Sequence, residues 1–263
     1  MASTPTHPGE RSTQGKFSKL STSNRYVARL AAALLSAAGI SGCQNINMNS
    51  AQLRVIDASP DAGVIDAYQN NSALAYNLGF GTMTSYVPMT PGSYTLAVDK
   101  AGTRQTLVAS TDTLVAGKQY TEIVGNGLAK MQQAVFLDQS APAPAGQIAV
   151  RLINEATRSG PVDVYLVPMS GRLANTSPIA VNLGFGANSG YITVPEGTYA
   201  IDVVPTGKAL ASSTVTLMSG AQADYASGAV RTVVLIDQET LGARHAAPTR
   251  GVRSIVAADA DAQ

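Results

Sequence analysis

Apolar and polar residues alternate along short segments of this chain, and turn-forming residues separate the segments. Two examples are Tyr94–Val98 (YTLAV) and Tyr199–Val203 (YAIDV), which each follow a Pro and a Gly typical of a tight turn. Alternation with a period of two is typical of a half-buried β-strand. Each half of the chain after Cys43 holds roughly seven or eight such segments, which favours antiparallel β-sandwiches. No amphipathic run there predicts a sizeable helix.

The same motifs occur twice. The segment Arg54–Tyr68 (RVIDASPDAGVIDAY) is similar to Arg151–Tyr165 (RLINEATRSGPVDVY), and NLGFG occurs at Asn77–Gly81 and Asn182–Gly186. The length differences between the copies fall in turns rich in Pro, Gly, Ser and Asn, which is how the loops of a duplicated domain diverge. The repeat therefore predicts two tandem Ig-like antiparallel β-sandwich domains.

A shorter match sets the C-terminal limits of the two copies. It aligns Phe136–Gln139 (FLDQ) with Leu235–Gln238 (LIDQ). The sequence after Leu241 shows no clean period. The predicted division is a first domain over 53–139, a Pro/Ala linker over 140–147, a second domain over 148–241 and a disordered tail over 242–263.

The N-terminal region has the pattern of an export signal. Arg25 and Arg29 precede the apolar run Leu30–Ile40, which is shorter than the roughly 20 residues that a membrane-spanning helix needs. We therefore interpret residues 1–42 as an N-terminal extension with a signal peptide. The polar residues before Arg25 form either a long n-region or a stretch upstream of a later translation start.

The end of this segment resembles the lipobox of bacterial lipoproteins. The residues are Ile40-Ser41-Gly42-Cys43, and Cys43 is the one Cys of the chain. The resemblance implies cleavage before Cys43 and lipidation of its thiol, with residues 43–52 as a tether. Gln44, in place of the Asp that retains lipoproteins in the inner membrane, favours the outer membrane. The alternative is an ordinary signal peptide with a Cys that is there by chance.

Composition narrows the function classes. Charged residues make up only 13% of the chain, and five of the 18 basic residues lie in the first 29 positions. The rest is mildly acidic and has no electrostatic footprint for nucleic acid. His7 and His245, with one Cys, provide neither a zinc site nor a well-placed catalytic base. We expect no cofactor, no metal site and no catalytic residues; a hydrolase that uses carboxylates alone is the enzymatic alternative.

Three segments carry a family resemblance. VIDASPDAGVIDAY, NLGFGTMTSY and PGSYTLAV are similar to the bacterial family known as domain of unknown function 4397. The resemblance covers both copies and implies a secreted or surface-attached Ig-like β-domain, without catalytic residues or a known ligand. Asp57 stands where the family often has His, and the second copy lacks the Ser-Pro-Asp element.

Two positions of the repeat are candidates for ligand contact: Asp66 and Tyr68, with Asp163 and Tyr165 in the second copy. Their apolar neighbours are expected to fill the core, so these four side chains are expected on the outer face. An exposed Asp/Tyr pair could stack on a sugar ring and bond its hydroxyls. Alternatively, the Asp anchors a loop and the Tyr packs on the sheet.

Two further motifs have a structural and a functional interpretation. The segment Asp57–Gly63 (DASPDAG) resembles a calcium loop weakly, but its Gly lies one place too late, and a turn is the alternative. In NLGFG, no Lys and no helix follow the glycines, which argues against a phosphate loop. We expect the Leu and Phe of both copies to be plugs in the sandwiches, with the glycines in conformations closed to other residues.

These observations predict a lipid-anchored cell-envelope protein that acts as a structural or binding module for a protein or glycan partner. The alternative is a carbohydrate-binding surface module that uses the exposed Tyr and Asp side chains.

Overall fold

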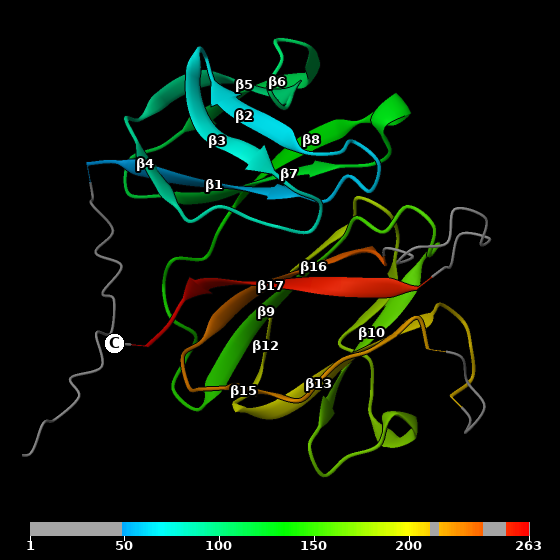
Figure 1. The fold of residues 1–263 in the computed structure, drawn as a ribbon. Coiled ribbons are helices and arrows are strands. Elements are labelled where there is room, and N and C mark those ends of the chain that lie inside the picture. Colours follow the sequence, from blue (N-terminus) through cyan, green and yellow to red (C-terminus); the bar gives the residue numbers. More distant parts are fainter. Residues whose placement is uncertain (1–48, 211–215, 239–250, 263) are drawn as a thin grey trace, which may run out of the picture. The chain divides into compact units, whose positions relative to one another are not determined.

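The computed structural model describes residues 49–210, 216–238 and 251–262, and these residues form an all-β protein (Figure 1). Cys43 and the predicted signal peptide lie outside the described residues. Within those ranges no helix has the length and apolar character needed to cross a membrane. The two helices present are single 3-10 turns, η1 (Leu128–Lys130) and η2 (Leu173–Asn175).

The strands divide into two halves with matching order. The first half contains β1 (Ala51–Asp57), β2 (Ile65–Gln69), β3 (Ser72–Leu78), β4 (Val87–Met89), β5 (Gly92–Lys100), β6 (Thr106–Leu114), β7 (Gln119–Gly125) and β8 (Gln132–Leu137). The second half contains β9 (Gln147–Asn154), β10 (Val162–Pro168), β11 (Ala180–Leu183), β12 (Asn188–Pro195), β13 (Gly197–Pro205), β14 (Met218–Ser219), β15 (Ala223–Tyr225), β16 (Val230–Asp237) and β17 (Val252–Ala260).

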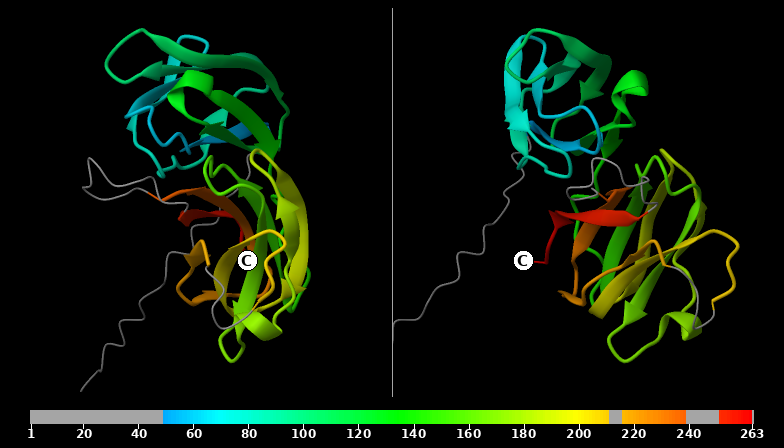
Figure 2. Two further views of the ribbon diagram at one scale, coloured as in Figure 1. Left: turned by 90° about the vertical axis from the view of Figure 1, so that its right-hand side faces the viewer. Right: turned by 45° about the vertical axis from the view of Figure 1, so that its right-hand side comes forward.

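Each half is a sandwich of two sheets (Figure 2). In the first half the strand orders are β4-β1-β7-β8 and β3-β2-β5-β6. In the second half they are β12-β9-β16-β17 and β11-β10-β13-β14, with β15 also paired to β13. The predicted all-β sandwich fold is confirmed, while the Ig-like topology stays a prediction.

The pairing is not antiparallel throughout. β1 pairs with β7 in parallel, and β9 pairs with β16 in parallel. Nearly every residue of these four strands is buried, on both faces of the sheet. Parallel strands are typical of sheets that are covered on both sides. Polar residues of these strands, such as Arg54 and Thr121, are therefore buried as well.

One face of each central strand fills its own sandwich. In β1, Leu53 and Val55 pack inside the first sandwich, and in β9, Val150 and Leu152 pack inside the second. The alternate residues of these strands face the other way, as the period of two requires. They belong to a cluster shared by the two halves: Ile56, Ala58, Ile123, Ile153, Val234, Ile236 and Ile255, with Phe80 and Phe136 against it. The sheets β4-β1-β7-β8 and β12-β9-β16-β17 thus contact each other through a common apolar layer.

The C-terminal segment differs from the predicted disordered tail. Val252–Ala260 forms β17, which pairs antiparallel with β16 and completes its sheet. The match of Leu235–Gln238 with Phe136–Gln139 was wrong as well, because Leu235 lies in β16, which takes the position of β7, whereas β17 takes the position of β8. The second part of β17 consists of Ala and one Asp, so pairing and burial on one face stabilise the strand without a strong apolar pattern.

The NLGFG prediction is right for Leu and wrong for Phe. Leu78 and Leu183 are buried in the cores of their sandwiches, as expected of plugs. Phe80 lies against the apolar layer between the halves, with the Arg253 guanidinium 4.7 Å from its ring centroid. Phe185 is 38% exposed. Only the second glycine of each motif has a positive φ, at 77° and 72°.

Candidate functional site

Asp66 and Asp163 hold the NLGFG loops. The Asp66 carboxylate is buried, accepting a bond from the Asn77 backbone N–H at 2.8 Å through Oδ1 and one from Gly102 at 3.0 Å through Oδ2. The Asp163 Oδ1 accepts the corresponding bond from Asn182 at 2.8 Å. The interpretation of these aspartates as loop anchors therefore describes the contacts that the structure shows.

The Asn of each motif explains why an anchor is needed. Asn77 and Asn182 have φ angles of 54° and 53°, in the left-handed region that Asn tolerates better than most residues. The Asp carboxylate fixes the backbone N–H of this bend. The sequence indicated a special backbone at the glycines but not at the Asn.

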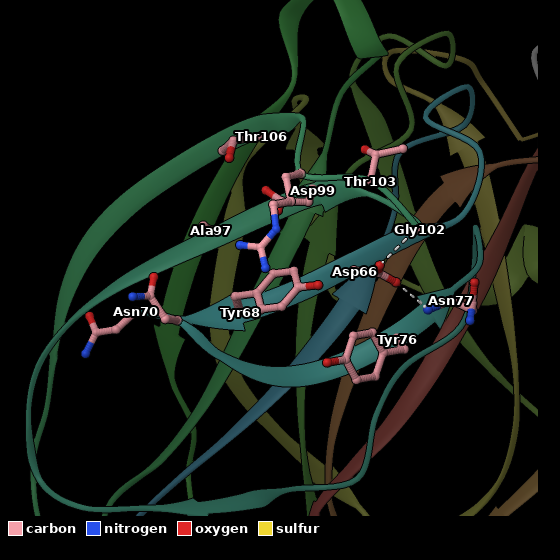
Figure 3. Close-up of a pocket in the computed structure, with 12 residues that line it drawn as sticks. Asp66, Tyr68, Asn70, Tyr76, Asn77, Ala97, Asp99, Gly102, Thr103 and Thr106 are labelled. Atoms are coloured by element: carbon pink, nitrogen blue, oxygen red, sulfur yellow. Dashed lines mark hydrogen bonds between the residues drawn. The ribbon is translucent and has the colours of Figure 1, made fainter.

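Tyr68 and the anchored loop border an open depression on the first sandwich (Figure 3). Its volume is about 880 Å³. Strands β2, β3 and β5 form its floor, and the β5–β6 turn borders it. The lining residues are Asp66, Tyr68, Asn70, Asn71, Tyr76, Asn77, Ala97, Asp99, Gly102, Thr103, Arg104 and Thr106.

Two tyrosine rings meet in this depression. Tyr68 and Tyr76 lie edge to face, with ring centroids 6.1 Å apart and planes at 86°. The Tyr76 side chain is 65% exposed. Burial, followed by the negative charges of Asp66 and Asp99, raises the pKa of Tyr68, while Arg104 acts in the opposite direction. The depression thus combines aromatic surface, which the solvent reaches, with charged and amide groups.

Asp99 is a lining residue that the sequence analysis missed. It lies on β5 directly opposite Asp66 on β2, so two carboxylates face each other across neighbouring strands. Like charges in this position destabilise a sheet. Asp66 is satisfied by two backbone N–H groups, whereas the buried Oδ1 of Asp99 has no hydrogen-bond partner among the described residues. The register of β2 and β5 brings the two together, and no local motif signals it.

The equivalent face of the second sandwich is closed. Tyr165 is only 5% exposed, so its predicted place on an exposed outer face was wrong. It packs with Val167 and Val204, and Leu173 and Leu210 lie against them. Val204 pairs with Asp163 as Asp99 pairs with Asp66. Val204 and Leu173, which belongs to η2 in the longer loop of this half, therefore cover Tyr165.

DASPDAG is a turn in the structure. The Asp57 Oδ1 accepts a bond from the Ser59 backbone N–H at 2.9 Å, and the Asp61 Oδ1 accepts one from Leu128 at 2.7 Å. Burial raises the pKa of Asp57 to about 7. In the parts of the chain that are described, no group of three or more His, Cys, Asp and Glu side chains could hold a metal ion.

A second polar cluster lies between the two halves, and we call it the reciprocal cluster: Arg54, Tyr86, Thr121 and Asp138 of the first half with Arg151, Tyr191, Thr232 and Asp259 of the second. Arg54 donates to Asp259 and, at 2.8 Å, to Thr121. Arg151 donates to Asp138 and, at 3.1 Å, to Thr232. Each half thus gives a carboxylate to the other half's arginine.

The remaining contacts of the reciprocal cluster lie within each half and are the same in both. Tyr86 donates to Asp138 at 2.7 Å, and its ring centroid lies 4.6 Å from the Arg54 guanidinium carbon. Tyr191 donates to Asp259 at 2.8 Å, and its ring centroid lies 4.8 Å from the guanidinium carbon of Arg151. Both Asp side chains are fully buried, which leaves no room for a ligand. This cluster joins the halves, and the depression at Tyr68 is the candidate site.

Comparisons with known proteins give one family match and several weak structural likenesses. A search of curated proteins gives no match. Solved structures with weak likeness include "Alpha-glucan binding by a streptococcal virulence factor". The two sequences are 8% identical, the match covers 70% of this chain and 91% of that chain, and the TM-score is 0.24. Another is a CBM26 module of Eubacterium rectale Amy13K with maltoheptaose, with 8% identity, 79% of this chain, 96% of that chain and a TM-score of 0.23. These likenesses are too distant to assign a ligand. The first sandwich, together with β9 and most of β10, lies within residues 51–165, which match the model of the family described as Domain of unknown function (DUF4397).

Proposed function

We propose that the first sandwich is a glycan-binding module and that its ligand occupies the depression at Tyr68 and Tyr76. The observation that carries this proposal is the pair of half-buried Tyr68 and exposed Tyr76, set among Asp, Asn, Thr and Arg side chains. A sugar ring has an apolar C–H face that stacks on an aromatic ring and hydroxyls that bond polar side chains.

The polar groups of the depression suit hydroxyl recognition. Asn71 and Arg104 are exposed, and neither side chain has a hydrogen-bond partner among the described residues. The Asp99 side chain is half-buried and lines the depression, and its buried Oδ1 has no hydrogen-bond partner among the described residues. Since sugar hydroxyls both donate and accept, they can satisfy donors and acceptors placed side by side.

Replacing Tyr76 with Ala is expected to weaken glycan binding by roughly tenfold, because the exposed ring provides stacking area and little packing. Tyr76→Phe is expected to retain most of the affinity. A glycan array followed by calorimetry measures the change. Phe185→Ala removes an aromatic ring that is 38% exposed in the second half and serves as the control. Binding that survives both Tyr68→Ala and Tyr76→Ala would contradict the proposal.

We further propose that the second half is another copy of the same family, in which the equivalent depression is filled. The matching strand orders and the matching Asp–Asn anchors support this proposal. Its role is then architectural, because Tyr165 and Val204 are buried where the first half is open.

We also propose that Cys43 anchors the protein to a bacterial envelope membrane, with the outer membrane favoured by Gln44. The support is the lipobox-like sequence alone. Cys43→Ser is expected to shift the protein from the detergent phase to the aqueous phase and to abolish labelling with radioactive palmitate, since several acyl chains give firm attachment. Ser41→Ala keeps a small residue in the motif and is the control. Unchanged partitioning of Cys43→Ser would refute the anchor.

A further inference from the structure

We propose that the depression prefers glycans with a free ammonium group, that is, amino sugars without an acetyl group on nitrogen. This inference rests on the proposed glycan-binding function and specifies its ligand class. It comes from two features of the lining, the opposed carboxylates and the tyrosine pair, and from a comparison with the equivalent face of the second half.

The opposed carboxylates provide the negative charge. Asp66 and Asp99 face each other across β2 and β5, and both line the depression. Both bonds of Asp66 are internal. Asp99 is half-buried and lines the depression, and its buried Oδ1 has no hydrogen-bond partner among the described residues, so Asp99 is the lining carboxylate that no such bond occupies. An ammonium group carries three donors and a positive charge, which offsets the repulsion between the two aspartates.

The tyrosine rings add to the same preference. The face of an aromatic ring carries negative electrostatic potential and attracts a cation within about 6 Å of the centroid. Tyr68 and Tyr76 meet at 86°, so they offer two differently directed surfaces at one site. The N-acetyl form of an amino sugar has lost the charge that both the rings and Asp99 would attract.

Arg104 is the cation among the lining residues and opposes an ammonium ligand. Its charge acts on the same Tyr68 hydroxyl as the aspartates, with the opposite sign. The described residues form no ion pair with it within 4.0 Å. Removing Arg104 is therefore expected to strengthen the binding of an ammonium ligand, whereas an acidic glycan would bind more weakly.

In the second half the residue opposite the anchor Asp163 is apolar. Val204 stands in the place of Asp99, and Tyr165 packs on it as part of an apolar cluster. An Asp at this position would be buried beneath Leu173 and Leu210. The carboxylate on this face of β13 is Asp202, which lies opposite Tyr165, is buried and accepts a bond from the Ser219 hydroxyl at 3.0 Å, whereas Asp99 lies in the half whose face is open to solvent.

The test compares three tetrasaccharides by calorimetry at pH 6: glucosamine, N-acetylglucosamine and glucose oligomers. We expect the glucosamine oligomer to bind at least tenfold more tightly than the other two. Asp99→Asn is expected to remove this preference, and Arg104→Gln is expected to increase it. Glu196→Gln removes an exposed carboxylate from the second half and is the matched control. Circular dichroism checks that each variant folds.

The outcomes separate this inference from the proposed function. Equal affinities for the three oligomers, lost in Tyr76→Ala, would overturn the ammonium preference and leave glycan binding in place. A preference that persists in Asp99→Asn would overturn the role of the carboxylate. Binding of none of the oligomers would overturn the inference, and a blank array with other glycans would overturn the proposed function as well.

Discussion

Replacing Asp259 with Ala is expected to lower the free energy of unfolding by about 3–5 kcal/mol, because Arg54 would remain buried without its carboxylate. The Arg54 guanidinium also donates to the Ala258 carbonyl and to Thr121, so the side chain cannot move to solvent without breaking further bonds. The more distant carboxylate, Asp138 at 3.8 Å, is already bonded to Arg151.

The midpoint of urea unfolding measures this loss. Asp261→Ala is the control, because Asp261 forms an ion pair with Arg231 and is largely exposed, and such pairs contribute about 0–1 kcal/mol. Asp138→Ala is expected to resemble Asp259→Ala, since it leaves Arg151 buried in the same way. A loss below about 1 kcal/mol in both variants would mean that the reciprocal cluster does not hold the halves together.

Glu155→Gln is expected to stabilise the protein at pH 8.5 by about 2–3 kcal/mol and to have little effect at pH 4. Glu155 is buried against Gly125, where its Oε2 has no hydrogen-bond partner among the described residues. Burial raises the pKa of this carboxyl from 4.5 to about 7. The charged form is therefore the one that folding disfavours.

The direction follows from proton binding. Between the unfolded pKa near 4.5 and the folded pKa near 7, the folded protein holds a proton that the unfolded chain has released. The contribution to stability is complete below the lower value and is lost as the pH rises through the higher one. Gln cannot ionise, so this part of the loss disappears in the variant.

Unfolding in urea across pH 4 to 9 measures the effect, with Glu196→Gln as an exposed control. A residual slope is expected in Glu155→Gln, because burial also raises the pKa of Asp57 to about 7 and that of Glu122 to about 8. Equal gains from Glu155→Gln at pH 4 and pH 8.5 would show that the charge is not the cause.

The repeat in the sequence predicted the sandwiches because turn and core residues act locally. Leu78 and Leu183 are buried in equivalent cores, and Asp66 and Asp163 recur at equivalent places. The reciprocal cluster was beyond such reasoning: Arg54 and Asp259 are 205 positions apart, and an alternating pattern does not reveal which sheet faces which.

Periodicity also failed at two points where a neighbouring segment decides the environment. It gave the face of Tyr165 but not the loop residues that cover it. It gave no signal for β17, whose Ala-rich sequence becomes a strand through pairing with β16. In both cases the missing information lay in another part of the chain.

The exchange of carboxylates between the halves has the symmetry of a homodimer built within one chain. Each side contributes an Arg, a Tyr, a Thr and an Asp, and the Asp of each side accepts a bond from the Arg of the other, as in a two-fold interface. The covalent link keeps both sides at high effective concentration and at equal numbers. One side can then differ from the other without loss of the contact: the second half keeps its share of the reciprocal cluster although its Tyr165 is buried where Tyr68 borders an open depression.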